Sequence, residues 1–301
     1  MKESIQGEGD RYLVDEIRSG SSEAFRRLVD RFGGRLKAFA ARRLQGSGID
    51  PEDAVQETFL SLLRSIDRLE GVRSLQAYLF TILRRRIVDL CRARGPATAQ
   101  LHMDANGESS SSGTEPASPE STPSTYVRRE EAVGARATIL ADILDSLLSR
   151  LKAERKFRDL KVLELLFSCG LSQGEAARKT GTSEPTVSRV RAAMVEELRG
   201  LIAGHPQKDA LEDLPEAEKR ELPVASLWRE NLFSCLKRST LGSYALGVLD
   251  EEWTDYVRFH LDTAGCEYCA AHLADINTEA GGISPSTRER IFASSAGFLR
   301  R

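Results

Sequence analysis

Four residues in the last third of the chain have types and spacing suited to binding a metal ion. Cys235, His260, Cys266 and Cys269 follow the pattern Cys-x24-His-x5-Cys-x2-Cys. Two cysteines separated by two residues can both reach one tetrahedral Zn²⁺, while a distant segment supplies the other ligands. The pattern therefore predicts a zinc site. His272, three residues after Cys269, is a competing ligand, and the alternative is that buried free cysteines simply pack a small helical unit.

The elements around this pattern are expected to be helical. Residues 227–276 read as helix, turn, helix, Cys-x2-Cys knuckle and helix. Apolar residues recur at helical spacing elsewhere too, from Phe25 to Phe39 and from Ile139 to Leu151. Strand patterns are almost absent, so we expect an all-α fold with two helical bundles and a small zinc-finger-like domain.

Composition excludes several classes of protein. The 301 residues are 41% hydrophobic and 29% charged, as in a globular protein. No apolar run is long enough for a transmembrane helix, and residues 1–17 lack the apolar core of a signal peptide. Five thinly spread cysteines favour a reducing, cytoplasmic location. No phosphate loop, His-Glu zinc helix or nucleophile elbow is present, so we do not expect an enzyme.

Charge is unevenly distributed along the chain. The formal net charge is −2, yet residues 1–95 carry +4, residues 150–199 carry +4 and residues 205–282 carry −8. Such asymmetry indicates polyanion-binding modules joined to a module with another task, although surface charge also varies between ordinary domains.

Residues 22–94 predict three consecutive helices. Ser21 or Ser22 is a suitable N-cap for the first, and Gly33-Gly34 marks a weak point within it. Asp50 can cap the second helix, with Pro51 at its first position. The third helix is apolar in its first half and basic in its second.

Residues 171–200 fit a helix-turn-helix. Ala177 is small where two helices cross, and Gly181 suits the turn because glycine tolerates a positive φ. Ser183 can cap the second helix. In such a motif this helix enters the major groove, where polar side chains meet phosphates and bases. The alternative is an ordinary helical hairpin. The residues expected to face outward are Glu184, Thr186, Ser188, Arg189 and Arg191.

A second candidate for nucleic-acid binding is the basic half of the third helix. Its arginines can neutralise phosphates, although a solvated helix face would look the same. They are Arg84, Arg85, Arg86, Arg92 and Arg94.

Two segments together resemble a known family. DPEDAVQETFLSLLRSI (50–66) and SLQAYLFTILRRRIVDLCRAR (74–94) are similar to region 2 of extracytoplasmic-function (group 4) sigma-70 family factors of bacterial RNA polymerase. Residues 130–200 resemble region 4 of the same family. The resemblance implies a sigma factor that binds core polymerase and recognises −10 and −35 promoter elements.

The resemblance also implies roles for residues. Asp53, Gln56, Glu57 and Phe59 would contact the clamp (beta-prime) of core polymerase, and region 4 would meet the beta flap. Residues 69–94 would hold the melted −10 element, and the outward face of 184–191 would read the −35 element.

The cysteine-containing segment is similar to zinc-binding anti-sigma domains, but two extra residues separate His260 from Cys266. The similarity implies an inhibitory module carried in the same chain and released by thiolate oxidation or zinc loss, or else a docking site for another regulator.

The alternative function is a helix-turn-helix regulator with a zinc-stabilised oligomerisation domain. We expect region 2 over 10–95, a flexible linker over 96–127, region 4 over 128–204, an acidic linker over 205–225, the zinc domain over 226–280 and a tail without recognisable chemistry over 281–301.

Overall fold

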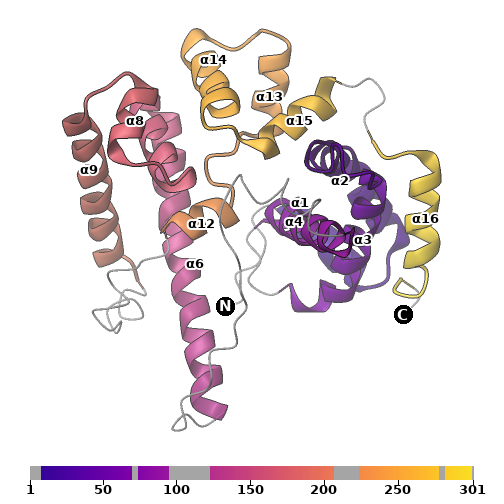
Figure 1. Ribbon diagram of the computed structural model, residues 1–301. Coiled ribbons are helices and arrows are strands. Elements are labelled where there is room, and N and C mark those ends of the chain that lie inside the picture. The colour runs from indigo at the N-terminus through magenta and orange to yellow at the C-terminus, as the bar shows by residue number, and fades with distance from the viewer. Residues whose placement is uncertain (1–7, 70–73, 95–122, 207–223, 278–281, 300–301) are drawn as a thin grey trace. The chain divides into compact units, whose positions relative to one another are not determined.

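The protein is all-α, as predicted. The computed structural model describes residues 8–69, 74–94, 123–206, 224–277 and 282–299, and no strand occurs within these ranges (Figure 1). None of the helices in them is both long and apolar enough to cross a membrane. The predicted linkers 96–127 and 205–225 fall mostly outside the described residues.

The chain divides into two compact units. One contains Met1–Gly107, Cys235–Leu249 and Cys266–Arg301, and the other contains Glu108–Ser234 and Asp250–Gly265. Residues after 223 therefore contribute to both units.

In the first unit, amphipathic helices surround a core of phenylalanine and leucine. Ser21 caps α2 by accepting a hydrogen bond from the Ala24 amide, and Asp50 caps α3 by accepting one from the Glu52 amide. Both caps lie where the sequence predicts them. The helices are α1 (Glu8–Arg18), α2 (Ser22–Arg43), α3 (Pro51–Ser65), the short 3₁₀ segment η1 (Ile66–Arg68) and α4 (Leu75–Arg94).

Three C-terminal helices complete this unit: α13 (Arg238–Ala245), α15 (Glu267–Asn277) and α16 (Pro285–Ser295). In Figure 1, α15 lies beside α2, and α16 lies beside α2 and α3. The helix α2 continues through Gly33 and Gly34, where the sequence predicts a weak point. Both glycines lie where Ile283 and Asp275 approach the helix.

The second unit contains the helix-turn-helix. Its turn is made by Gly181 at φ +65°, a conformation that favours glycine. The predicted apolar stripe of α6, from Ile139 to Leu151, is buried. The elements are α6 (Pro123–Ala153), α7 (Phe157–Leu163), the π-helix η2 (Glu164–Ser168), α8 (Gln173–Thr180), α9 (Glu184–Ala203), α12 (Val224–Glu230), α14 (Glu251–Arg258) and the π-helix η3 (Phe259–Thr263).

Candidate functional site: nucleic-acid, polymerase and metal-binding surfaces

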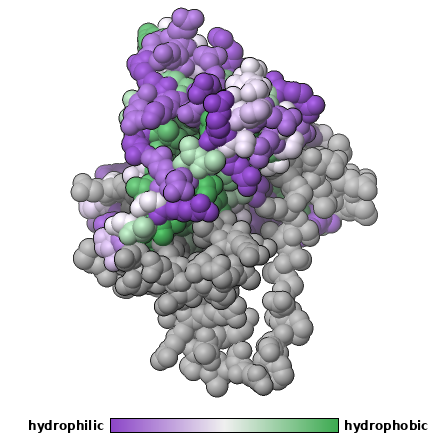
Figure 2. Space-filling model, turned by 90° about the vertical axis from the view of Figure 1, so that its left-hand side faces the viewer, coloured by the Kyte–Doolittle hydropathy of each residue, from purple (hydrophilic) through white to green (hydrophobic). Residues whose placement is uncertain are grey.

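The helix α9 has a buried face and an exposed face. Val187 is fully buried, whereas Glu184, Ser188, Arg189 and Arg191 are exposed and Thr186 is half-buried. The Arg189 guanidinium donates to the Pro185 carbonyl and the Thr186 hydroxyl at 3.3 Å, so it lies along its own helix. Figure 2, viewed from the side where Figure 1 draws α9, shows hydrophilic residues over most of the described surface, with smaller hydrophobic patches. This exposed face can meet a nucleic acid.

Most of the predicted basic half of α4 is available to solvent. Arg84, Arg85 and Arg92 are exposed, whereas Arg86 is half-buried and donates to the Ser61 hydroxyl at 3.0 Å. Arg84 donates to the Tyr268 hydroxyl of α15 at 3.2 Å. Arg94 ends α4, and its side chain lies outside the described part of the chain.

The predicted polymerase-binding residues of α3 do not all face outward. Asp53 is exposed, and Gln56 and Glu57 are half-buried. Phe59 is fully buried, with its ring edge-on to Phe25 at 6.2 Å. Phe59 therefore belongs to the core, and only the three polar residues can contact a partner.

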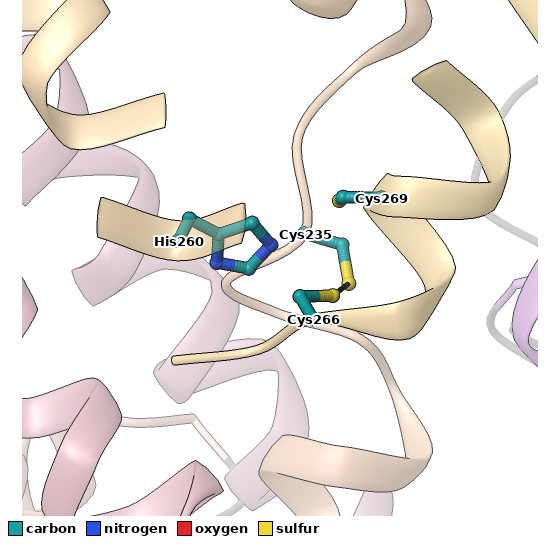
Figure 3. A group of neighbouring side chains, drawn as sticks. All are labelled: Cys235, His260, Cys266 and Cys269. Carbon is teal, nitrogen blue, oxygen red and sulfur yellow. Dashed lines mark hydrogen bonds between the residues drawn. The ribbon is translucent and has the colours of Figure 1, made fainter. Parts of the chain in front are cut away.

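The four predicted metal ligands lie together (Figure 3). The ligand atoms offered by Cys235, His260, Cys266 and Cys269 all fall within 4.8 Å of one another. The Cys235 and Cys266 sulfurs are 3.6 Å apart. Tetrahedral thiolates at a Zn–S distance of about 2.3 Å would be separated by roughly 3.8 Å, so this spacing fits zinc.

The chemistry of the donors also fits a cation. Hydrogen bonds with Cys266 and Cys269, together with burial, raise the pKa of the Cys235 thiol well above its usual value. Neighbouring thiolates repel one another, and a bound cation removes that repulsion. The Leu236 amide donates to the Cys269 sulfur at 3.2 Å, which also favours a thiolate there.

Glu164, which the sequence pattern did not indicate, orients the histidine. Its carboxylate lies 2.5 Å from Nδ1 of His260, and both side chains are almost fully buried. The Tyr256 hydroxyl donates to the same carboxylate at 3.3 Å. Metal-binding histidines commonly donate one ring nitrogen to a carboxylate, which leaves the other nitrogen for the metal. The sequence pattern does not indicate Glu164, because it lies nearly a hundred residues before His260 and in a π-helix.

The unusual spacing before Cys266 has a local structural basis. His260 lies in the π-helix η3, and Gly265 has a φ of +67°. π-Helical turns accommodate extra residues and are frequent at functional sites. The competing ligand His272 is not part of the cluster; it lies 3.5 Å from a nitrogen of Arg35. Burial, with the charges of Arg35 and Arg238, lowers the pKa of His272 to about 3.

Tyr268 is a further residue that sequence reasoning missed. Its ring stacks on Phe39 at 5.2 Å and meets Phe80 edge-on at 4.9 Å. The neighbouring Glu267 forms an ion pair with Arg43 on α2 at 2.5 Å. The helix α15 is thus bound to α2 and α4 by an aromatic cluster and a charge pair.

In the second unit, acidic residues of α14 face basic residues around α7. Lys161 pairs with Asp255 at 2.5 Å. Arg155 pairs with Asp250 at 2.9 Å and with Glu252 at 3.0 Å. The acidic block of the sequence therefore neutralises part of the basic block within this unit.

Comparison with known proteins identifies the family. The family model for sigma-70 region 2 matches residues 28–96. The chain is 31% identical over 184 residues to the ferric citrate uptake sigma factor FecI of Escherichia coli, covering 61% of this chain and 94% of the relative. It is 30% identical over 191 residues to the RNA polymerase sigma factor CnrH of Cupriavidus metallidurans, covering 62% and 93%. No solved structure gave a significant match.

The match to region 2 runs from Leu28 within α2 through the end of α4, so it includes the polar residues of α3 and the arginines of α4 described above. Nearly the whole length of two named sigma factors aligns with this chain. The chain therefore belongs to the extracytoplasmic-function group of sigma-70 family factors, and it is a sigma factor that starts transcription with core RNA polymerase at promoter DNA.

Proposed function

We propose that the two units divide promoter recognition between them. The exposed face of α9 reads the duplex −35 element, because its polar and basic residues suit the major groove. The arginines of α4 hold the melted −10 element by neutralising phosphates. The polar residues of α3 contact the clamp of core polymerase.

The residues after 223 hold the α4 and α3 surfaces inactive in cis. The observation that carries this proposal is the contact of Tyr268 with Arg84, since it engages one of the arginines assigned to the −10 element. The Glu267–Arg43 pair supports this proposal, because the Glu267 carboxylate of α15 neutralises the Arg43 cation of α2.

Zinc held by Cys235, His260, Cys266 and Cys269 stabilises this inhibitory module. The ion supplies folding free energy, as in other small zinc domains, and takes no part in a reaction. The Glu164 carboxylate keeps the His260 ring in place, and the Leu236 amide supports the Cys269 sulfur.

Run-off transcription with core polymerase on selected promoter DNA tests this function. The full chain is compared with a version ending at Gly204 and with the full-length Tyr268→Ala variant. We expect the shortened version and Tyr268→Ala to initiate several-fold better than the wild type. Tyr12→Ala is the control, because Tyr12 is 59% exposed.

Equal or better initiation by the wild-type chain would remove the inhibitory role and leave the sigma function intact. No initiation by any form on any promoter would contradict the proposed promoter contacts themselves.

A further inference from the structure

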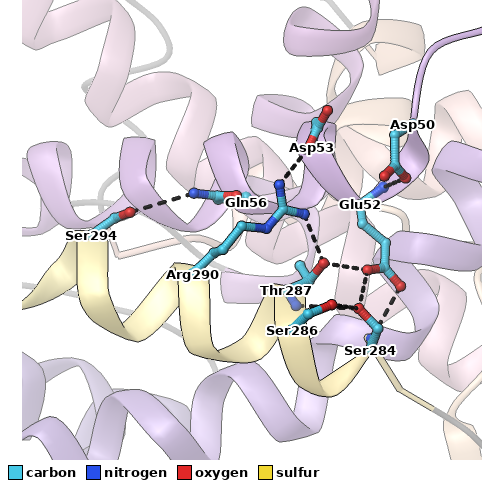
Figure 4. Close-up of polar contacts among 9 residues, drawn as sticks. All are labelled: Asp50, Glu52, Asp53, Gln56, Ser284, Ser286, Thr287, Arg290 and Ser294. Atoms are coloured by element: carbon cyan, nitrogen blue, oxygen red, sulfur yellow. Dashed lines mark hydrogen bonds and ion pairs between the residues drawn. The ribbon is translucent and has the colours of Figure 1, made fainter.

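The outward face of α3 is covered by the last helix of the chain. Figure 4 shows α16 lying along this face, with side chains from both helices pointing toward each other. We name the α3 residues in contact, Glu52, Asp53 and Gln56, the acidic face. Two of its three members, Asp53 and Gln56, belong to the set assigned to core polymerase.

Glu52 is bound by the first turn of α16. The Ser284 amide donates to its carboxylate at 3.1 Å, and the hydroxyls of Ser284 and Thr287 donate to the other oxygen. Lys37 of α2 completes the set at 2.6 Å. Ser284 is also the N-cap of α16, so the position of Glu52 suits the positive end of the helix dipole.

The remaining polar contacts extend along the helix. Arg290 pairs with Asp53 at 3.0 Å and donates to Thr287 at 2.9 Å. The Gln56 amide donates to the Ser294 hydroxyl at 3.4 Å. The Arg290–Asp53 pair is about half-exposed, so it contributes little adhesion and mainly fixes the position of α16.

Apolar contacts anchor the same helix. Ile291 is fully buried, and the Phe292 ring lies edge-on to Phe25 at 6.1 Å. The Arg26 guanidinium lies over the Phe292 ring at 4.9 Å. A buried apolar side chain such as Ile291, surrounded by complementary polar contacts, is typical of a specific interface.

We propose that α16 occupies the acidic face in the free protein and competes there with core polymerase. The inference rests on the proposed contact of Asp53 and Gln56 with polymerase. The face offers carboxylates, so either occupant must present cations and hydroxyl or amide donors, as α16 does. Because α16 is tethered to the same chain, its effective concentration is high, and polymerase binds with reduced apparent affinity until α16 leaves.

Equilibrium binding of labelled full-length protein to core polymerase tests this competition. Ile291→Asp removes the apolar anchor, and Arg290→Gln removes the ion pair without touching the core. We expect at least tenfold tighter polymerase binding for Ile291→Asp and about threefold for Arg290→Gln. Ala293→Asp is the matched control, because it makes the same charge change as Ile291→Asp at an exposed position of α16.

Hydrogen exchange of the α16 amides is measured on the same proteins. Polymerase affinity equal to wild type in a variant whose α16 has lost protection would overturn the competition, while leaving the sigma function in place. If Ile291→Asp does not fold, Arg290→Gln tests the competition in its place: lost protection of α16 with wild-type polymerase affinity would overturn it. Failure of every form, the wild type included, to bind polymerase would overturn the proposed function and the competition together.

Discussion

At the scale of single residues, Gly34 allows Asp275 and the backbone of Gly282 to approach α2 closely. A Cβ atom at this position would lie 1.9 Å from a carboxylate oxygen of Asp275 and 2.9 Å from the backbone nitrogen of Gly282. Asp275 is held in place by Arg238 at 2.6 Å. At Gly33 the nearest atom, on Ile283, would be 3.4 Å away, which is an ordinary contact.

Gly34→Ala is therefore expected to separate the C-terminal segment from α2. Alanine normally stabilises a helix interior by about 0.5–1 kcal/mol relative to glycine, so α2 itself should remain folded. We expect faster hydrogen exchange in α15 and α16, with little change for Gly33→Ala. Equal protection in both variants would show that Asp275 and Gly282 move aside without cost.

Acid should also release the first turn of α16. Burial opposes ionisation of Glu52, but hydrogen bonds from Lys37, Ser284 and Thr287 outweigh it and lower its pKa to about 2. The ordinary pKa of this carboxyl is near 4.5. Its stabilising contribution is therefore complete above pH 4.5 and is lost as the pH falls toward 2. Thermal unfolding from pH 7 to 2.5 should show this loss, and Glu52→Gln should flatten it; an unchanged acid profile in Glu52→Gln would contradict the assignment.

Glu164 should influence metal binding without being a ligand. A carboxylate that orients a metal-binding histidine typically contributes 10–100-fold to metal affinity. We expect Glu164→Gln to lower zinc affinity by such a factor, measured by competition with a chromophoric chelator. Glu196→Gln serves as the control, because its side chain is 79% exposed. Unchanged affinity in Glu164→Gln would mean that the Glu164–His260 contact does not support the site.

At the scale of elements, local signals predicted helices well and long-range packing poorly. The caps Ser21 and Asp50 and the left-handed Gly181 act within a few residues, so their sequence pattern is sufficient. The helix α16 has a weak apolar pattern, and its partners on α3 lie more than 230 residues earlier. Nothing local in the sequence indicates such pairing, nor the π-helices that carry Glu164 and His260.

The helix α9 should lose promoter affinity when its outward arginines are removed. A bidentate arginine–guanine contact contributes about 1–3 kcal/mol of discrimination, and a phosphate contact lowers affinity for all sequences alike. We expect Arg191→Ala to weaken duplex binding measurably and to reduce its salt dependence. Arg199→Ala, at a 72% exposed side chain nearer the end of α9, should have less effect. Equal losses at both positions would indicate general electrostatics rather than a recognition surface.

At the scale of the whole molecule, a net charge of −2 conceals complementary blocks. Within one unit Glu267 pairs with Arg43, and within the other Asp255 pairs with Lys161. At α16 the signs are exchanged: the later residue, Arg290, is the cation, and the earlier residue, Asp53, is the anion. A polyanion such as DNA must therefore displace a carboxylate to reach Arg43 or Lys161, and a partner that binds Asp53 must displace Arg290. The proposed inhibition in cis therefore requires that the residues after 223 stay folded.

Removing zinc is expected to relieve this inhibition in the full chain. Metal binding and folding are coupled in small zinc domains, so loss of the ion from the proposed ligands should loosen the module and free the sigma surfaces. Treatment with a zinc chelator, with metal content measured in parallel, should raise run-off transcription several-fold, and Cys266→Ser should reproduce the gain without chelator. The version ending at Gly204 should not respond. Zinc release with unchanged or lower transcription would show that the metal module stabilises the active protein instead of restraining it.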